Sequence, residues 1–108
     1  MGYNKDMVKN TPKVRHLRYE ALRRSLIETV KIWPYIYEHK IIGKNADTFK
    51  DALKVLETSF PLLNKKSMNL SKNGTYLSLT YEFRAKDVDE IISLWIASED
   101  LQDSITVF

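Results

Sequence analysis

The stretch SKNGTYLSLTYEFR, residues Ser71–Arg84, is the most informative part of the sequence because it places a tight turn directly before a regularly alternating strand. Asn73 and Gly74 predict a hairpin turn, since these two residues adopt positive φ angles at the lowest cost. From Tyr76 onward apolar and polar residues alternate, so successive side chains point to opposite faces of a sheet. The inward face is predicted to carry Leu77, Leu79, Tyr81 and Phe83, and the outward face Tyr76, Ser78, Thr80, Glu82 and Arg84. Turn and register are therefore the main role predicted for this stretch.

A strand and a helix are predicted before the hairpin. Tyr35–Gly43 is rich in aromatic and β-branched residues, which favours a strand with Tyr37, His39 and Ile41 on its core face. Asn45–Phe60 predicts a helix that Asp47 caps and Pro61 ends. The buried stripe of this helix is predicted from residues at helical spacing: Phe49, Ala52, Leu53, Leu56 and Phe60.

The remaining elements complete a recognisable order. Lys65–Leu70 is a weak strand by composition, and Ile105–Phe108 predicts a short last strand. Between them, Asp87 is predicted to cap a second helix, whose apolar stripe is Val88, Ile91, Ile92, Trp95 and Ile96. The order β-α-β-β-α-β predicts an α+β, ferredoxin-like sandwich over residues 34–108, an antiparallel four-stranded sheet with both helices on one face.

A basic N-terminal segment precedes this sandwich. We predict that residues 1–10 form a flexible lead-in. Residues 11–33 are predicted to form an amphipathic helix with Thr11 as its cap and Pro12 at its first position. Its stripe is Tyr19, Leu22, Leu26, Val30 and Trp33, and Pro34 closes it. Residues 1–33 contain eight basic and three acidic residues, a net charge of +5. The rest of the chain contains nine basic and eleven acidic residues, a net charge of −2. This asymmetry indicates a solvated helix face or a footprint for an acidic partner.

Two motifs carry a resemblance to a known family. WPYIYEHKIIG, residues Trp33–Gly43, and SKNGTYLSLT, residues Ser71–Thr80, resemble the YbeD-like family of small bacterial proteins of unknown function. The resemblance covers Trp33–Phe108 and implies a ferredoxin-like fold similar to the regulatory ACT domains of amino-acid enzymes. It brings no established activity with it. One departure is His39, which stands where the family usually has Tyr or Phe.

Composition excludes several kinds of catalytic site. The 108 residues suit a single core, and the absence of Cys excludes thiol nucleophiles, zinc–thiolate clusters and disulfides. His16 and His39 fall in different elements, and the predicted faces separate His39 from Ser78, so His39 is expected to be a buried, hydrogen-bonded histidine. Glycines are too few for a phosphate-binding loop. We expect a cytoplasmic protein that is not an enzyme, with no cofactor, no signal peptide and no membrane-spanning segment.

The expected function is therefore binding or regulation. We expect a protein partner or a homodimer, reached through an exposed edge strand or through the stripe of Tyr19, Leu22, Leu26 and Trp33. A small-molecule sensor remains an alternative, with Lys40, Ser71, Lys72 and Tyr76 as its contacts. Nucleic-acid binding is a further alternative because of the basic helix, although Tyr76 is the one aromatic residue on the outward face of its strand.

Overall fold

The computed structural model describes residues 12–108, which fall into a unit ending at Lys31 and a unit Ile32–Phe108. The first unit contains helix α2 (Pro12–Thr29), so Pro12 does occupy the first helical position. The helix ends at Thr29 rather than at Trp33, because the residues before Pro34 already form a bend. The predicted lead-in and the Thr11 cap lie outside the described residues.

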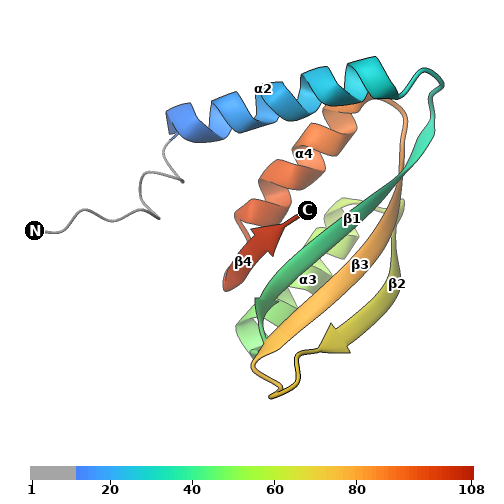
Figure 1. The fold of residues 1–108 in the computed structure, drawn as a ribbon. Coiled ribbons are helices and arrows are strands. Elements are labelled where there is room, and N and C mark those ends of the chain that lie inside the picture. The colour runs from blue at the N-terminus through green and yellow to red at the C-terminus, as the bar shows by residue number, and fades with distance from the viewer. Residues whose placement is uncertain (1–11) are drawn as a thin grey trace, which may run out of the picture. The chain divides into compact units, whose positions relative to one another are not determined.

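The second unit is the predicted ferredoxin-like sandwich. Its strands are β1 (Tyr35–Lys44), β2 (Leu63–Leu70), β3 (Tyr76–Ala85) and β4 (Ser104–Val107), and its helices are α3 (Asp47–Ser59) and α4 (Val88–Glu99). The strands pair in the order β2-β3-β1-β4, and every pair is antiparallel. Both helices cover one face of this sheet (Figure 1). The predicted element order and layer arrangement are confirmed.

The register of the two central strands confirms the predicted faces. β1 pairs with β3 from Tyr35 opposite Ala85 to Lys44 opposite Tyr76. All four residues predicted to face inward on β3 are buried, as are His39 and Ile41 on β1. The helices add buried side chains at Phe49, Leu53, Leu56, Ile91, Ile92 and Leu94. Each large apolar side chain buried in this way contributes about 1.5–3 kcal/mol. One stripe position was wrong: Ile96 is exposed, and Leu94 lies in the core instead.

The helix caps follow the sequence in one case and not in the other. Asp87 caps α4 as predicted, because its Oδ1 accepts a hydrogen bond from the Glu90 amide at 3.0 Å, while Glu90 Oε1 accepts one from the Lys86 amide at 2.8 Å. The prediction that Asp47 caps α3 is wrong. Ala46 occupies that position without a side-chain bond, and Asp47 is the first helical residue, where its charge favours the helix dipole.

The β2–β3 turn differs in detail from the predicted Asn-Gly turn. Gly74 has a φ of 72°, but Asn73 does not share the positive sign. The Gly74 amide donates to the Ser71 carbonyl at 2.9 Å, so Lys72 and Asn73 form the centre of a turn with ordinary φ angles. The five-residue connection allows Gly74 alone to supply the left-handed residue that returns the chain to the sheet.

Candidate functional site at the open edge of the sheet

Strand β2 is an open edge of the sheet. It pairs with β3 on one side, and the strand order gives it no neighbour on the other. Leu63 is its one buried residue, and the seven residues that follow are exposed. Such an edge offers unpaired backbone N–H and C=O groups to any strand that approaches it.

The first half of this edge is protected. Lys65 and Lys66 place two charges there, and the ladder is interrupted by a register shift between Lys65 and Ser67. Lys66 Nζ lies 3.5 Å from a carboxylate oxygen of Glu82 on the neighbouring strand. Lysines and bulges are the usual means by which natural sheets discourage pairing at an edge. This half is therefore poorly suited to receive another strand.

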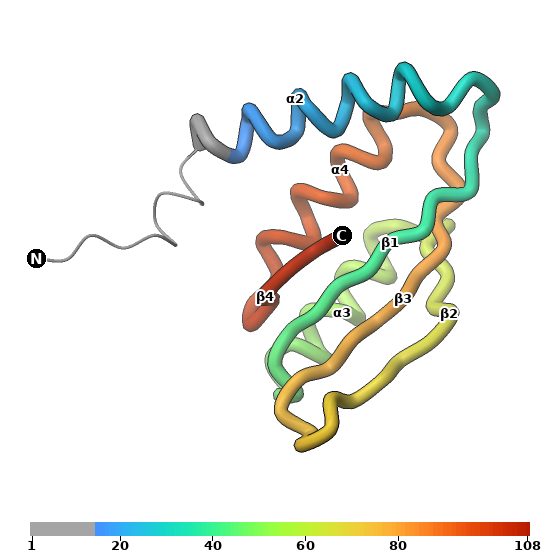
Figure 2. Tube along the Cα trace, viewed as in Figure 1, coloured from blue at the N-terminus to red at the C-terminus, as the bar shows by residue number. Residues whose placement is uncertain are grey.

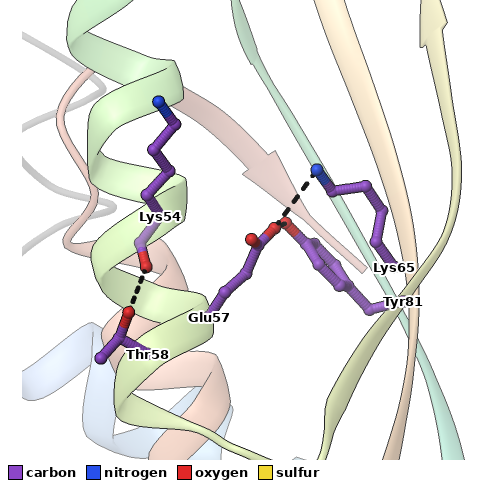
Figure 3. Close-up of polar contacts among 5 residues, drawn as sticks. All are labelled: Lys54, Glu57, Thr58, Lys65 and Tyr81. Atoms are coloured by element: carbon purple, nitrogen blue, oxygen red, sulfur yellow. Dashed lines mark hydrogen bonds and ion pairs between the residues drawn. The ribbon is translucent and has the colours of Figure 1, made fainter.

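A polar cluster around Glu57 fixes the protected half to helix α3. Glu57 projects from α3 toward Tyr81 and Lys65 (Figure 3): its Oε2 accepts a hydrogen bond from the Tyr81 hydroxyl at 2.7 Å and lies 3.6 Å from Lys65 Nζ. Burial and the neighbouring carboxylate both raise the pKa of Tyr81, so its hydroxyl stays protonated and remains a donor. The cluster thus connects α3, β3 and the start of β2.

The second half, Ser67–Leu70, lacks this protection, and we call it the open segment. It carries no charge, no proline and no register shift. The side chains of Met68 and Leu70 lie on the helix-bearing face, opposite buried Leu79 and Leu77, yet they remain 57% and 58% exposed. Two apolar side chains on an uncharged edge are typical of a site for strand addition.

The backbone of the open segment is also oriented for pairing. The Ser71 amide donates to the Tyr76 carbonyl at 2.9 Å, which fixes the alternation of the β2–β3 ladder. By that alternation Ser67 and Asn69 bond to β3, whereas the amides and carbonyls of Met68 and Leu70 point away from the sheet. Backbone donors and acceptors therefore coincide with the two exposed apolar residues.

The hairpin residues predicted as contacts continue this segment. Ser71, Lys72 and Tyr76 are all exposed at the β2–β3 turn. The turn lies beside the β1–α3 connection (Figure 2). Two hydrogen bonds join them: the Asn45 amide donates to the Thr75 carbonyl at 2.9 Å, and Asn45 Nδ2 donates to the Gly74 carbonyl at 2.8 Å. The turn is thus a supported end of the edge.

Lys40 does not join these residues in one site. It lies on β1 opposite Thr80, whereas Tyr76 lies opposite Lys44, four register positions away. At the usual rise of a strand this separation is roughly 13 Å. The structure thus places Lys40 and Tyr76 on the same face without bringing them together.

The predicted contacts on the N-terminal stripe are found in two different units. Tyr19, Leu22 and Leu26 belong to α2, and Trp33 belongs to the second unit. The Tyr19 hydroxyl accepts hydrogen bonds from Arg15 Nε and Nη2 at 3.3 and 3.2 Å, and the Arg18 guanidinium carbon lies 5.7 Å from its ring centroid. Trp33 packs edge-to-face against Tyr35. Tyr19 is therefore already engaged by the basic residues of its own helix.

A cavity at the other end of the sheet was not predicted from the sequence. A pocket of about 400 Å³ lies between the α3–β2 connection and the start of α4. Its lining is Ser59, Phe60, Pro61, Leu62, Phe83, Lys86, Asp87, Asp89, Glu90 and Ser93. The rings of Phe60 and Phe83 pack edge-to-face there, with their centroids 5.8 Å apart. Of the acidic residues in this lining, Asp87 was predicted as the cap of α4, but the pocket itself depends on the approach of two segments that are distant in sequence.

His39 is a core residue, as predicted, and its partner is on α4. Its Nε2 lies 2.9 Å from Ser98 Oγ, and both side chains are buried. Ser78 lies on the opposite face of the sheet, so the structure forms no pair between His39 and Ser78. Among the residues described, no group of three or more His, Asp or Glu side chains is arranged to hold a metal ion. No helix in the described part of the chain has the length and apolar content needed to cross a membrane.

Comparisons with known proteins agree with this architecture. The ACT domain of GTP pyrophosphokinase from Chlorobium tepidum superposes with a TM-score of 0.56 at 15% identity, over 68% of this chain and 95% of that domain. The solution structure of protein HP0495 from H. pylori superposes with a TM-score of 0.58 at 21% identity, over 73% of this chain and 86% of that protein. No protein of curated function matches the chain. The model of a family of proteins of unknown function, DUF493, matches residues 28–105, and the chain belongs to this family.

Proposed function

We propose that this protein is a non-catalytic interaction module that pairs with a second copy of itself through the open segment Ser67–Leu70. The observation that carries the proposal is the contrast within β2. Lysines and a register shift protect its first half, whereas its second half exposes Met68 and Leu70 together with outward-pointing backbone groups. A strand that is protected along half its length and open along the other half is suited to one defined partner.

The open segment is complementary to itself in one antiparallel register. With a two-fold axis at Asn69, Met68 of one copy lies opposite Leu70 of the other, and the same pair recurs across the axis. These are the residues whose amides and carbonyls point outward, so each pair can exchange two backbone hydrogen bonds. The apolar side chains of both pairs lie on the helix-bearing face, where they cover each other from water.

A binding role also agrees with the structural hydrogen bonds that the His39, Asp87 and Glu90 side chains already make. His39 is engaged by Ser98 in the core, and Asp87 and Glu90 are engaged in the cap of α4. The chain shares its fold with the ACT domain of the GTP pyrophosphokinase. The fold alone does not assign a function, so the proposal depends on the edge itself.

Sedimentation velocity over a range of protein concentrations tests the proposal. We expect reversible dimerisation that Met68→Lys abolishes, because a lysine opposes strand pairing at an edge. The matched control is Val55→Lys, since Val55 is an exposed apolar residue on α3 rather than on the edge. The proposal is wrong if the unmodified protein stays monomeric at every concentration, or if both substitutions weaken the dimer equally.

A second candidate function, small-molecule sensing, is favoured by one observation, the pocket of about 400 Å³ with Phe60 and Phe83 in its lining. Its volume lies within the range of ligand sites. A thermal-shift screen of amino acids and organic acids, repeated on Leu62→Asp, tests this candidate. Stabilisation that the substitution removes supports sensing, and a screen in which no compound raises the melting temperature counts against it.

A further inference from the structure

A buried polar cluster joins the central strand β1 to helix α4, and the functions proposed above do not involve it. His39 on β1 has no solvent exposure, and its Nε2 lies 2.9 Å from Ser98 Oγ on α4. The rings of Tyr37 and Trp95 each lie with their centroids 5.9 Å from the imidazole. Trp95 Nε1 donates to the Tyr37 hydroxyl at 2.7 Å, which closes the cluster.

The hydrogen bonds determine which imidazole nitrogen carries the proton. The Ser98 hydroxyl donates its single hydrogen to the Leu94 carbonyl at 2.7 Å. Ser98 Oγ can therefore only accept from His39, so Nε2 carries the hydrogen and Nδ1 is the nitrogen with the free lone pair. Nδ1 is itself buried and has no hydrogen-bond partner. A second proton would place a charge and an unsatisfied donor in the core.

We propose that His39 is an acid-sensitive latch between β1 and α4, which holds the helix on the sheet while the imidazole is neutral and weakens that packing when Nδ1 is protonated. The proposal rests on the fixed Nε2–H form and the unpartnered Nδ1. It is independent of how the protein pairs with a partner.

The groups around the ring do not offset the added charge. From α4 the ring meets Ser98 and Trp95, and from β1 it meets Tyr37, whose pKa burial raises so that its hydroxyl stays neutral. Tyr81, opposite His39 on β3, gives its hydroxyl hydrogen to Glu57. Burial accordingly lowers the pKa of His39 to about 4.

The direction of the pH effect follows from the difference between the pKa of His39 in the folded and in the unfolded chain. The unfolded chain has its histidine pKa near 6.5, above the folded value, so the unfolded state takes up the proton first as the pH falls. The contribution of neutral His39 to the stability of the folded state is complete above about pH 6.5 and is lost progressively as the pH falls toward 4. Between pH 7 and pH 4.5 His39 alone should reduce the folding equilibrium constant about 60-fold.

Urea unfolding of the full chain and of His39→Phe, at pH 7 and pH 4.5, tests the latch. Phe has a ring of similar size and cannot be protonated, so the variant retains the carboxylate effects that both proteins share. Between pH 7 and pH 4.5 we expect the folding equilibrium constant of the original protein to fall by a factor about 60-fold larger than that of the variant. Equal losses in the two proteins would overturn the proposal.

A second measurement applies even if His39→Phe does not fold. The imidazole carbon-bound proton of His39 can be followed by NMR as the pH is lowered in the folded protein, with its resonance assigned against His16→Gln. We expect no titration of His39 between pH 7.5 and pH 5.5. A folded-state pKa of 6.5 or above would overturn the proposal.

Discussion

Gly43→Ala should destabilise the protein because the new methyl group has no room beside helix α3. A Cβ on Gly43 would lie 2.5, 2.6 and 2.7 Å from three ring carbons of Phe49, whereas ordinary contacts are 3.4–4 Å. The ring would have to move by about 1 Å, and Phe49 is fully buried in a close-packed core. Overpacking of this kind costs about 1–3 kcal/mol.

Urea denaturation followed by circular dichroism measures this cost as a change in the free energy of unfolding. The matched control is Gly74→Ala, since a Cβ on Gly74 meets nothing within 4 Å and its cost of about 1 kcal/mol comes from the positive φ alone. Phe49→Leu, which removes the ring, should reduce the cost of Gly43→Ala in the double variant. Additive effects of the two substitutions, or a cost below about 0.5 kcal/mol for Gly43→Ala, would refute the steric explanation.

Substitutions at three further contacts are tested by the same assay. Tyr81→Phe removes the hydroxyl that donates to Glu57 and should lower the free energy of unfolding by about 1 kcal/mol, and an unchanged value would show that the cluster does not stabilise the edge. Asp87→Ala removes the α4 cap and should cost about 1 kcal/mol, whereas Asp47→Ala, without a capping bond to lose, should cost less. Ser98→Ala leaves His39 Nε2–H without an acceptor and should cost about 1–3 kcal/mol, so a neutral result would contradict the assigned tautomer.

The fold was predictable because its signals are local. Alternation from Tyr76 to Arg84 and the capping residue Asp87 each depend on a few neighbouring residues, and together with the helical periodicities they identify the order of elements. The errors have local causes too. Asp47 and Ala46 compete for one cap position, and Asn73 belongs to a longer connection than a two-residue turn.

The site was less predictable because it depends on the tertiary arrangement. Lys65–Leu70 has the composition of a weak strand, and its two unequal halves appear only once the strand order makes it an edge. His39 was expected to be buried, but Ser98, 59 positions away, could not be identified as its partner without the packing of α4 on β1. The pocket beside Phe60 likewise depends on the meeting of distant segments.

Amide hydrogen exchange along β2 shows whether two copies of the protein pair through the open segment. If two copies pair there, the amides of Met68 and Leu70 should exchange more slowly as the protein concentration rises, because each gains an acceptor on the other copy. The amide of Asn69, which bonds to β3, is the internal control and should be equally protected at all concentrations. Exchange of Met68 and Leu70 that stays fast while the protein dimerises would contradict the claim and place the interface elsewhere.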